Sequence, residues 1–218
     1  MKLFTRCLLA CALLVSFTSS ANDKSERVVL LSPTQSGWAE WQPKSFEGLT
    51  SYNIVDGEVP MVKAESRGTA SGMFLEKELN IKEYPVLSWS WRVEKGLNAH
   101  DESTKDGDDY AARVYVVVSG GLFFWKTIAI NYVWSSNPET NATWSNAYAG
   151  DNAQMVALRG SDDKQGEWYF EARNLREDFR ELFDRDIDVI DGIAIMTDTD
   201  DTDSVAVAHY GEMYLSKD

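Results

Sequence analysis

Two short acidic segments contain the side chains best suited to hold a cation. Residues 106–109 read Asp-Gly-Asp-Asp just before an apolar run, and residues 198–203 read Asp-Thr-Asp-Asp-Thr-Asp just after another. Carboxylate oxygens bind calcium or magnesium in preference to zinc. If folding brings the segments together, we expect a calcium-supported site at these residues: Asp108, Asp109, Asp198 and Asp200.

Neither segment is a complete calcium loop. The spacing of Asp198, Asp200 and Thr202 resembles the start of an EF-hand. Asp203 stands where that loop needs glycine and His209 where it needs glutamate, which excludes an EF-hand. Aspartates are also common in turns between strands, where they are exposed and solvated. A solvated turn is therefore the alternative for each segment taken alone.

The chain is rich in aromatic side chains, with eight tryptophans and nine tyrosines. Indole faces stack on sugar rings while nearby polar groups bind the hydroxyls, so this composition favours saccharide binding. A large aromatic core is the alternative. Alternation along strands predicts core positions for Trp89, Trp91, Trp134 and Trp168. Four tryptophans lie in loops or at strand ends and are better placed to bind a ligand: Trp38, Trp41, Trp125 and Trp144. Of these, we take Trp125 and Trp144 as candidate ligand contacts.

Four charged residues lie inside expected strands: Arg92, Arg113, Glu171 and Arg173. Charges on a strand face normally pair, so an ion-pair network over one sheet is the first interpretation. The alternative is a polar groove in which arginine forks bind a carboxylate or sugar hydroxyls. In that groove Arg113, Glu171 and Arg173 would contact the ligand.

Common catalytic motifs are missing from the sequence, which contains no Gly-x-Ser-x-Gly, no His-Glu-x-x-His and no phosphate-binding glycine loop. Cleavage of a glycosidic bond needs only two carboxyl groups. Glu171 with Asp109 or Asp198 is the pair that could act as acid and base, and it defines a glycan-cleaving alternative.

The elements that must position these residues are mostly strands. Residues 86–93 alternate between apolar and polar side chains, as a half-buried strand does. Similar segments separated by Gly, Asn, Asp and Pro predict about ten strands in total. Residues 174–183 alone read as a helix, because Asn174 can cap it and Glu177 follows at capping-box spacing. We therefore expect an all-β, jelly-roll-like antiparallel β-sandwich with one short helix.

The first 21 residues are typical of a secretory signal, with Lys2 and Arg6 before an apolar stretch and small residues at its end. Residues 22–218 would then form a single domain, in the periplasm or secreted. Both cysteines, Cys7 and Cys11, fall within the signal. Disulfides, thiolate catalysis and cysteine-bound zinc are therefore not expected in the mature domain.

The net charge of the chain, -14, disfavours nucleic acid as a partner. An anionic membrane surface is disfavoured for the same Coulombic reason. Saccharides, cations and basic proteins remain as partners.

Several motifs together resemble a bacterial family known as domain of unknown function 3047. They are Trp-Ser-Trp at residues 89–91, Asp-Asp-x-x-x-Arg at 108–113, Tyr-Val-Trp at 132–134, Glu-Ala-Arg-Asn at 171–174 and Thr-Asp-Thr-Asp at 197–200. One departure is Asp201, where such sequences tend to have asparagine. The resemblance implies an exported β-sandwich similar in outline to carbohydrate-binding modules, and it implies no established activity.

These observations lead to one main hypothesis and two alternatives. The main hypothesis is an exported domain that binds a saccharide or similar polar ligand, with calcium organising the acidic segments. The alternatives are the glycan-cleaving enzyme described above and an envelope scaffold without a small ligand, whose aromatic side chains would be nearly all internal.

Overall fold

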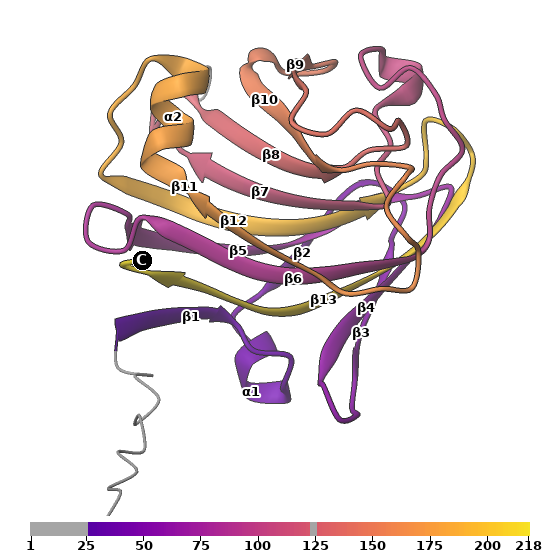
Figure 1. The fold of residues 1–218 in the computed structure, drawn as a ribbon, viewed down its shortest axis with the longest axis horizontal. Helices are drawn as coiled ribbons and strands as arrows, with labels where there is room; N and C mark the ends of the chain where they lie inside the picture. Colours follow the sequence, from indigo (N-terminus) through magenta and orange to yellow (C-terminus); the bar gives the residue numbers. More distant parts are fainter. Residues whose placement is uncertain (1–25, 123–125) are drawn as a thin grey trace, which may run out of the picture.

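The two sheets of the molecule stack face to face and enclose one hydrophobic core (Figure 1). The computed structural model describes residues 26–122 and 126–218. The predicted signal and Trp125 therefore lie outside the described residues. The six-stranded sheet contains β1 (Arg27–Leu31), β3 (Ser51–Val55), β4 (Met61–Arg67), β6 (Val86–Lys95), β11 (Tyr169–Asn174) and β13 (Val205–Ser216). The seven-stranded sheet contains β2 (Gln42–Glu47), β5 (Ala70–Asn80), β7 (Ala112–Val118), β8 (Ile128–Trp134), β9 (Thr143–Asn146), β10 (Gly150–Arg159) and β12 (Val189–Asp198).

The predicted jelly-roll-like sandwich is confirmed, with three differences in detail. Thirteen strands are described instead of about ten, because β1, β2, β9 and β10 were not expected. Two segments predicted as separate strands, 205–209 and 212–215, form the single strand β13. The pair β8 and β10 is parallel, while the other pairs between described strands are antiparallel.

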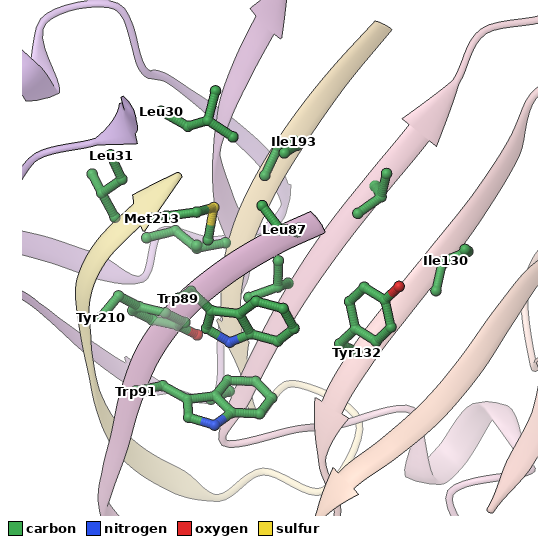
Figure 2. Close-up of a cluster of buried hydrophobic side chains, with 14 of the residues drawn as sticks. Leu30, Leu31, Leu87, Trp89, Trp91, Ile130, Tyr132, Ile193, Tyr210 and Met213 are labelled. Atoms are coloured by element: carbon green, nitrogen blue, oxygen red, sulfur yellow. The ribbon is translucent and has the colours of Figure 1, made fainter. Parts of the chain in front are cut away.

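The core is built from large aromatic side chains of both sheets. Figure 2 shows the indoles of Trp89 and Trp91 extending from β6 toward Tyr132 on β8. The ring centroids of Trp89 and Tyr132 are 5.3 Å apart, and Trp134 packs edge-on against Trp91. The predicted core positions of these three tryptophans are therefore confirmed.

Two other tryptophans differ from their predicted positions. Trp41 was expected in a loop with a better chance of binding, but its side chain is only 3% exposed and its Nε1 donates a hydrogen bond to the Leu30 carbonyl at 3.1 Å. Trp168 was expected in the core and is instead half-buried, with the guanidinium of Arg92 at 5.3 Å from its ring. A buried indole usually finds a partner for its N–H, and the backbone of Leu30 supplies one for Trp41.

Helix α2 (Leu175–Phe183) confirms the one helix that the sequence predicted. The Asn174 side chain accepts a hydrogen bond from the Glu177 amide, as an N-cap does. Leu175 and Phe179 on one face join the core. Two further short turns of helix, α1 (Gln35–Trp38) and η2 (Lys105–Gly107), were not predicted. No helix within the described part of the chain is long and apolar enough to cross a membrane.

The fold brings the two acidic segments to the same end of the sandwich. One segment lies at η2, just before β7, and the other follows β12. In Figure 1 both loops are at the right-hand end of the view, opposite α2. This placement sets up the candidate site.

Candidate functional site

A cavity of about 680 Å³ lies on the outer face of the seven-stranded sheet. Side chains alternate between the two faces of a strand. On β7, Val114 and Val116 therefore enter the core while Arg113 and Tyr115 line the cavity. On β8, Asn131 lines the cavity between core residues of the opposite face. The same β-alternation that builds the core thus supplies the lining of the cavity.

Arg113 forms the charged floor of the cavity and is only 2% exposed. Its Nε donates to Asp198 Oδ1 at 2.9 Å, and its terminal nitrogens form ion pairs with Asp198 and with Asp108, the latter at 3.5 Å. The guanidinium also lies 4.4 Å from the centroid of the Tyr110 ring. A buried guanidinium is stable only with such partners. Arg113 therefore joins the two acidic segments by contacting one aspartate from each.

The acidic segments meet closely. Carboxylate oxygens of Asp109, Asp198 and Asp200 lie within 4.8 Å of one another. Asp109 is fully buried and accepts hydrogen bonds from the amide and hydroxyl of Thr202, each at 2.6 Å. Asp108 accepts from the Asn146 amide at 2.9 Å. The structure thus brings together three of the four residues that the sequence proposed for a cation, Asp109, Asp198 and Asp200, while Asp108 is connected to them through Arg113.

The crowding of carboxylates changes their acidity. Burial raises the pKa of Asp200, and the neighbouring charges of Asp201 and Asp109 raise it further. Burial and the charge of Asp109 likewise raise the pKa of Asp201. The hydroxyl of Tyr148 donates to Asp201 at 2.8 Å, and this bond raises the Tyr148 pKa to about 12. The carboxylates of this region therefore carry more negative charge than their ion pairs with Arg113 neutralise.

Asn131 presents an unpaired acceptor in the cavity lining. Its side chain is 1% exposed, and its Oδ1 has no hydrogen-bond partner among the described residues. Leaving a buried carbonyl oxygen unpaired costs roughly 1–3 kcal/mol, so such an atom needs an explanation, for example a ligand or water that donates to it. The sequence offered one signal for this residue, an amide within an otherwise apolar strand, but its unpaired state could not be predicted.

Aromatic side chains stand at the rim of the cavity. Tyr148 and Phe46 are each 58% exposed, and Tyr115 lies deeper. These three residues were not among the ligand contacts predicted from the sequence, which were tryptophans and charged residues. Their signal was weak, because Phe46 belongs to the wholly exposed strand β2 and Tyr148 to a loop.

Trp144, a predicted ligand contact, does not line this cavity. It packs over Tyr110, with ring centroids 6.4 Å apart, and the two rings cover the apolar end of the outer sheet face. Trp144 instead lines a separate cavity of about 360 Å³ together with His100 and Glu102. The Glu102 carboxylate there is held by Ser135 and the Ser136 amide.

Glu171 and Arg173 do not line the larger cavity either. Glu171 accepts from Arg159 Nε at 2.7 Å and from Trp91 Nε1 at 2.9 Å. Arg173 pairs with Asp178, which also accepts from the hydroxyl of Tyr132. These polar bonds close the edge of the sandwich between the sheets. No contact joins Glu171 to Asp109 or Asp198 among the described residues, so the structure does not bring together the pair considered for glycan cleavage.

Comparison with known proteins identifies a family. The family model described as "Protein of unknown function (DUF3047)" matches residues 38–214. A search of curated proteins gave no match. Among solved structures, the family 30 carbohydrate-binding module of a cellulosomal cellulase of Clostridium thermocellum is 8% identical, with a TM-score of 0.49 over 88% of this chain and 98% of that one.

Two further solved structures are similar at the same distant level. The cellulose-induced protein Cip1 is 8% identical, with a TM-score of 0.47 over 86% of this chain and 96% of that one. The family 11 carbohydrate-binding module from Clostridium thermocellum, in complex with a mixed-linked tetrasaccharide, is 11% identical, with a TM-score of 0.44 over 88% of this chain and 95% of that one.

Proposed function

The chain belongs to the DUF3047 family, and we propose that it is an exported domain that binds a saccharide in the cavity on the outer face of the seven-stranded sheet. The observation that carries this proposal is the unpaired Oδ1 of the buried Asn131. A ligand hydroxyl or N–H that donates to this oxygen would remove the cost of leaving it unpaired.

The size and lining of the cavity support this ligand class. Its volume, about 680 Å³, falls within the range of small-molecule sites. Tyr115 and Tyr148 offer aromatic surface, while Asn131 and Asp200 offer hydrogen-bond acceptors. Aromatic rings combined with a few fixed polar groups match the alternating apolar faces and hydroxyl edges of a sugar ring.

Calcium support of the site stays a prediction from the sequence. An ion bound by Asp109, Asp198 and Asp200 would have to share carboxylate oxygens that already accept from Thr202 or pair with Arg113. The positive charge of Arg113 would also repel the ion. Export to the periplasm or the medium rests on residues 1–21 and is part of the same proposal.

The test is calorimetric titration of the purified protein with neutral, acidic and amino oligosaccharides. We expect saturable binding to at least one class, and its loss in Asn131→Leu. Asn53→Leu, on the exposed edge strand β3 of the other sheet, is the matched control and should bind as the wild type does. Circular dichroism checks that both variants fold. If no class of saccharide binds saturably, the proposal is wrong.

A further inference from the structure

Three basic side chains form a row across the outer face of the six-stranded sheet. In the strand register, His209 on β13 lies directly opposite Arg92 on β6 and, on its other side, directly opposite Lys63 on β4. The residues before and after each of these three along its strand belong to the core, so the three side chains point away from it. Residues directly opposite each other in antiparallel strands have Cβ atoms about 4.5–5.5 Å apart. The three basic groups are therefore neighbours, on the face of the sandwich opposite the cavity.

Arg92 has no acidic partner within the described part of the chain. Arg159 and Arg173, at the edge of the same sandwich, each pair with a carboxylate, whereas no ion pair involves Arg92. Its Nε is buried without a hydrogen-bond partner, and its Nη2 lies 3.9 Å from Met61 Sδ, a weak acceptor. A guanidinium presents five N–H donors in a planar fork that matches a carboxylate. Arg92 therefore keeps donors that the carboxylate of a ligand can use.

The carboxylates near the row do not cancel its positive charge. Glu65 is shared, since it pairs with Arg67 and, at 3.3 Å, with Lys63. Glu94 lies 3.5 Å from Nε2 of His209, whose pKa burial lowers to about 4, so this imidazole is uncharged at neutral pH. The Nδ1 of the same imidazole has no partner among the described residues. Carboxylates more than about 8 Å away are largely screened at physiological ionic strength, so the row attracts anions although the whole chain has a net charge of -14.

Aromatic rings adjoin the row at β11. The guanidinium carbon of Arg92 lies 5.3 Å from the ring of Trp168. Phe170 is 78% exposed and lies directly opposite Ser90, two residues before Arg92 on β6. A sugar ring has apolar C–H faces that pack on such aromatic surface, and a uronic acid unit adds a carboxylate at the edge of the ring. An acidic peptide has carboxylates but lacks the rigid apolar faces, so this surface favours an acidic saccharide.

We propose that this face is a second binding site, which holds an acidic saccharide with its carboxylate on the guanidinium of Arg92 and its sugar ring against Phe170. Lys63 lies at the other end of the row, so an oligomer with a carboxylate on every unit is attracted along the whole row. This site goes beyond the proposed function, because it lies on the opposite face of the sandwich from the cavity and shares no lining residue with it.

The experiment compares two probes that differ in charge at the carboxyl groups. They are an oligomer of galacturonic acid and the methyl ester of the same oligomer. Each is titrated calorimetrically into the wild-type protein and into Asn131→Leu, which lacks the unpaired acceptor of the cavity. Binding that survives this change belongs to the other face. We expect the acid to bind Asn131→Leu saturably and about tenfold more tightly than the ester, since hydrogen bonds to charged groups contribute more than neutral ones.

Substitutions on the proposed surface show whether this preference comes from the row. Arg92→Gln should weaken binding of the acid about tenfold and leave binding of the ester unchanged. Arg185→Gln is the matched control, because it removes the same charge from an exposed arginine that has no ion pair among the described residues, and it should change neither affinity. Phe170→Ser alters an exposed side chain and should weaken binding of the acid about threefold without disturbing the core. Circular dichroism checks that each variant folds.

The outcomes separate this site from the cavity. If the acid does not bind Asn131→Leu, or binds it no better than the ester does, the second site is refuted, whatever saccharide the cavity takes. An affinity for the acid that is unchanged in Arg92→Gln also refutes it. If triglutamate binds as tightly and with the same dependence on Arg92, the surface recognises acidic peptides and the saccharide assignment is wrong. The proposal for the cavity is judged separately, by the binding that is lost in Asn131→Leu.

Discussion

Arg113 on β7 and Asp198 at the end of β12 form an ion pair in which each residue is only 2% exposed. The two residues belong to neighbouring strands, with Met196 directly opposite Arg113 in the ladder. Their pairing fixes the floor of the cavity and connects it to the acidic loop that follows β12. The stability of the domain and the shape of the site therefore depend on the same contact.

Removing Arg113 should destabilise the protein strongly. Arg113→Leu leaves Asp198 and Asp108 buried without their cation, and breaking a buried pair in this way costs about 3–5 kcal/mol. Urea denaturation measures the change in free energy of unfolding. Arg67→Leu, which breaks an exposed pair with Glu65, is the control and should cost less than about 1 kcal/mol. A similar small loss in both variants would show that the buried pair is not important for stability.

Replacing Asn131 should have opposite effects on stability and on binding. Asn131→Leu removes a buried unpaired oxygen, so we expect the free energy of unfolding to stay the same or rise by about 1 kcal/mol. The same change should abolish saccharide binding in the cavity. A destabilisation of more than about 2 kcal/mol would mean that the amide has a structural partner within the protein.

Asp200 should destabilise the native protein at neutral pH. In the folded state its pKa is raised by burial and by nearby carboxylates. Below the usual carboxyl pKa this group does not oppose folding, but the protein loses stability as pH rises through the raised pKa of the folded state, because the charged form is then less stable in the folded protein than in the unfolded chain. Asp200→Asn should therefore raise the free energy of unfolding at pH 7. The gain should vanish below about pH 4. A gain that does not depend on pH would contradict this explanation.

His209 on β13 should make the protein sensitive to mild acid. Burial, together with the charges of Arg92 and Lys63, lowers its pKa to about 4, although Glu94 acts in the opposite direction. Since the unfolded state takes up the proton first, stability should fall as pH falls from about 6.5 to about 4, by on the order of 2 kcal/mol. His209→Gln should flatten this slope of stability against pH, whereas His100→Gln should leave it in place. An unchanged slope in His209→Gln would assign the acid sensitivity to other groups.

Calcium should have little effect on the stability of the protein. Because Arg113 and Thr202 already bond to the clustered carboxylates, we expect millimolar calcium to change the melting temperature by less than about 1 °C relative to buffer with chelator. Differential scanning calorimetry makes this comparison directly. A rise of several degrees would support the calcium site that the sequence suggested.

Alternating and capping residues allowed much of the fold to be predicted. The strand at 86–93 and the helix capped by Asn174 follow from local side-chain periodicity, which is visible in a single sequence. Strand β2 was missed because all six of its residues are exposed, so it has no apolar face. Strand β13 was divided in two because Gly211 interrupts its apolar pattern.

The candidate site was less predictable because it depends on long-range pairing. The acidic composition of the two loops suggested that they could meet, and they do. The partners of the charged strand residues could not be deduced, since Glu171 pairs with Arg159 and Arg113 with Asp198 through contacts between distant segments. Asn131 was visible as an amide in an apolar strand, but only the arrangement of its neighbours reveals that its oxygen is unpaired.

Strand β13 lies between β6 and β4 in the six-stranded sheet and also pairs with β1. It follows every other described strand along the chain. Until β13 is inserted between β6 and β4, the hairpin of β3 and β4 is not hydrogen-bonded to the pair of β6 and β11. The six-stranded sheet can therefore be completed only after β13 has been synthesised, so its assembly depends on contacts between segments far apart in the sequence.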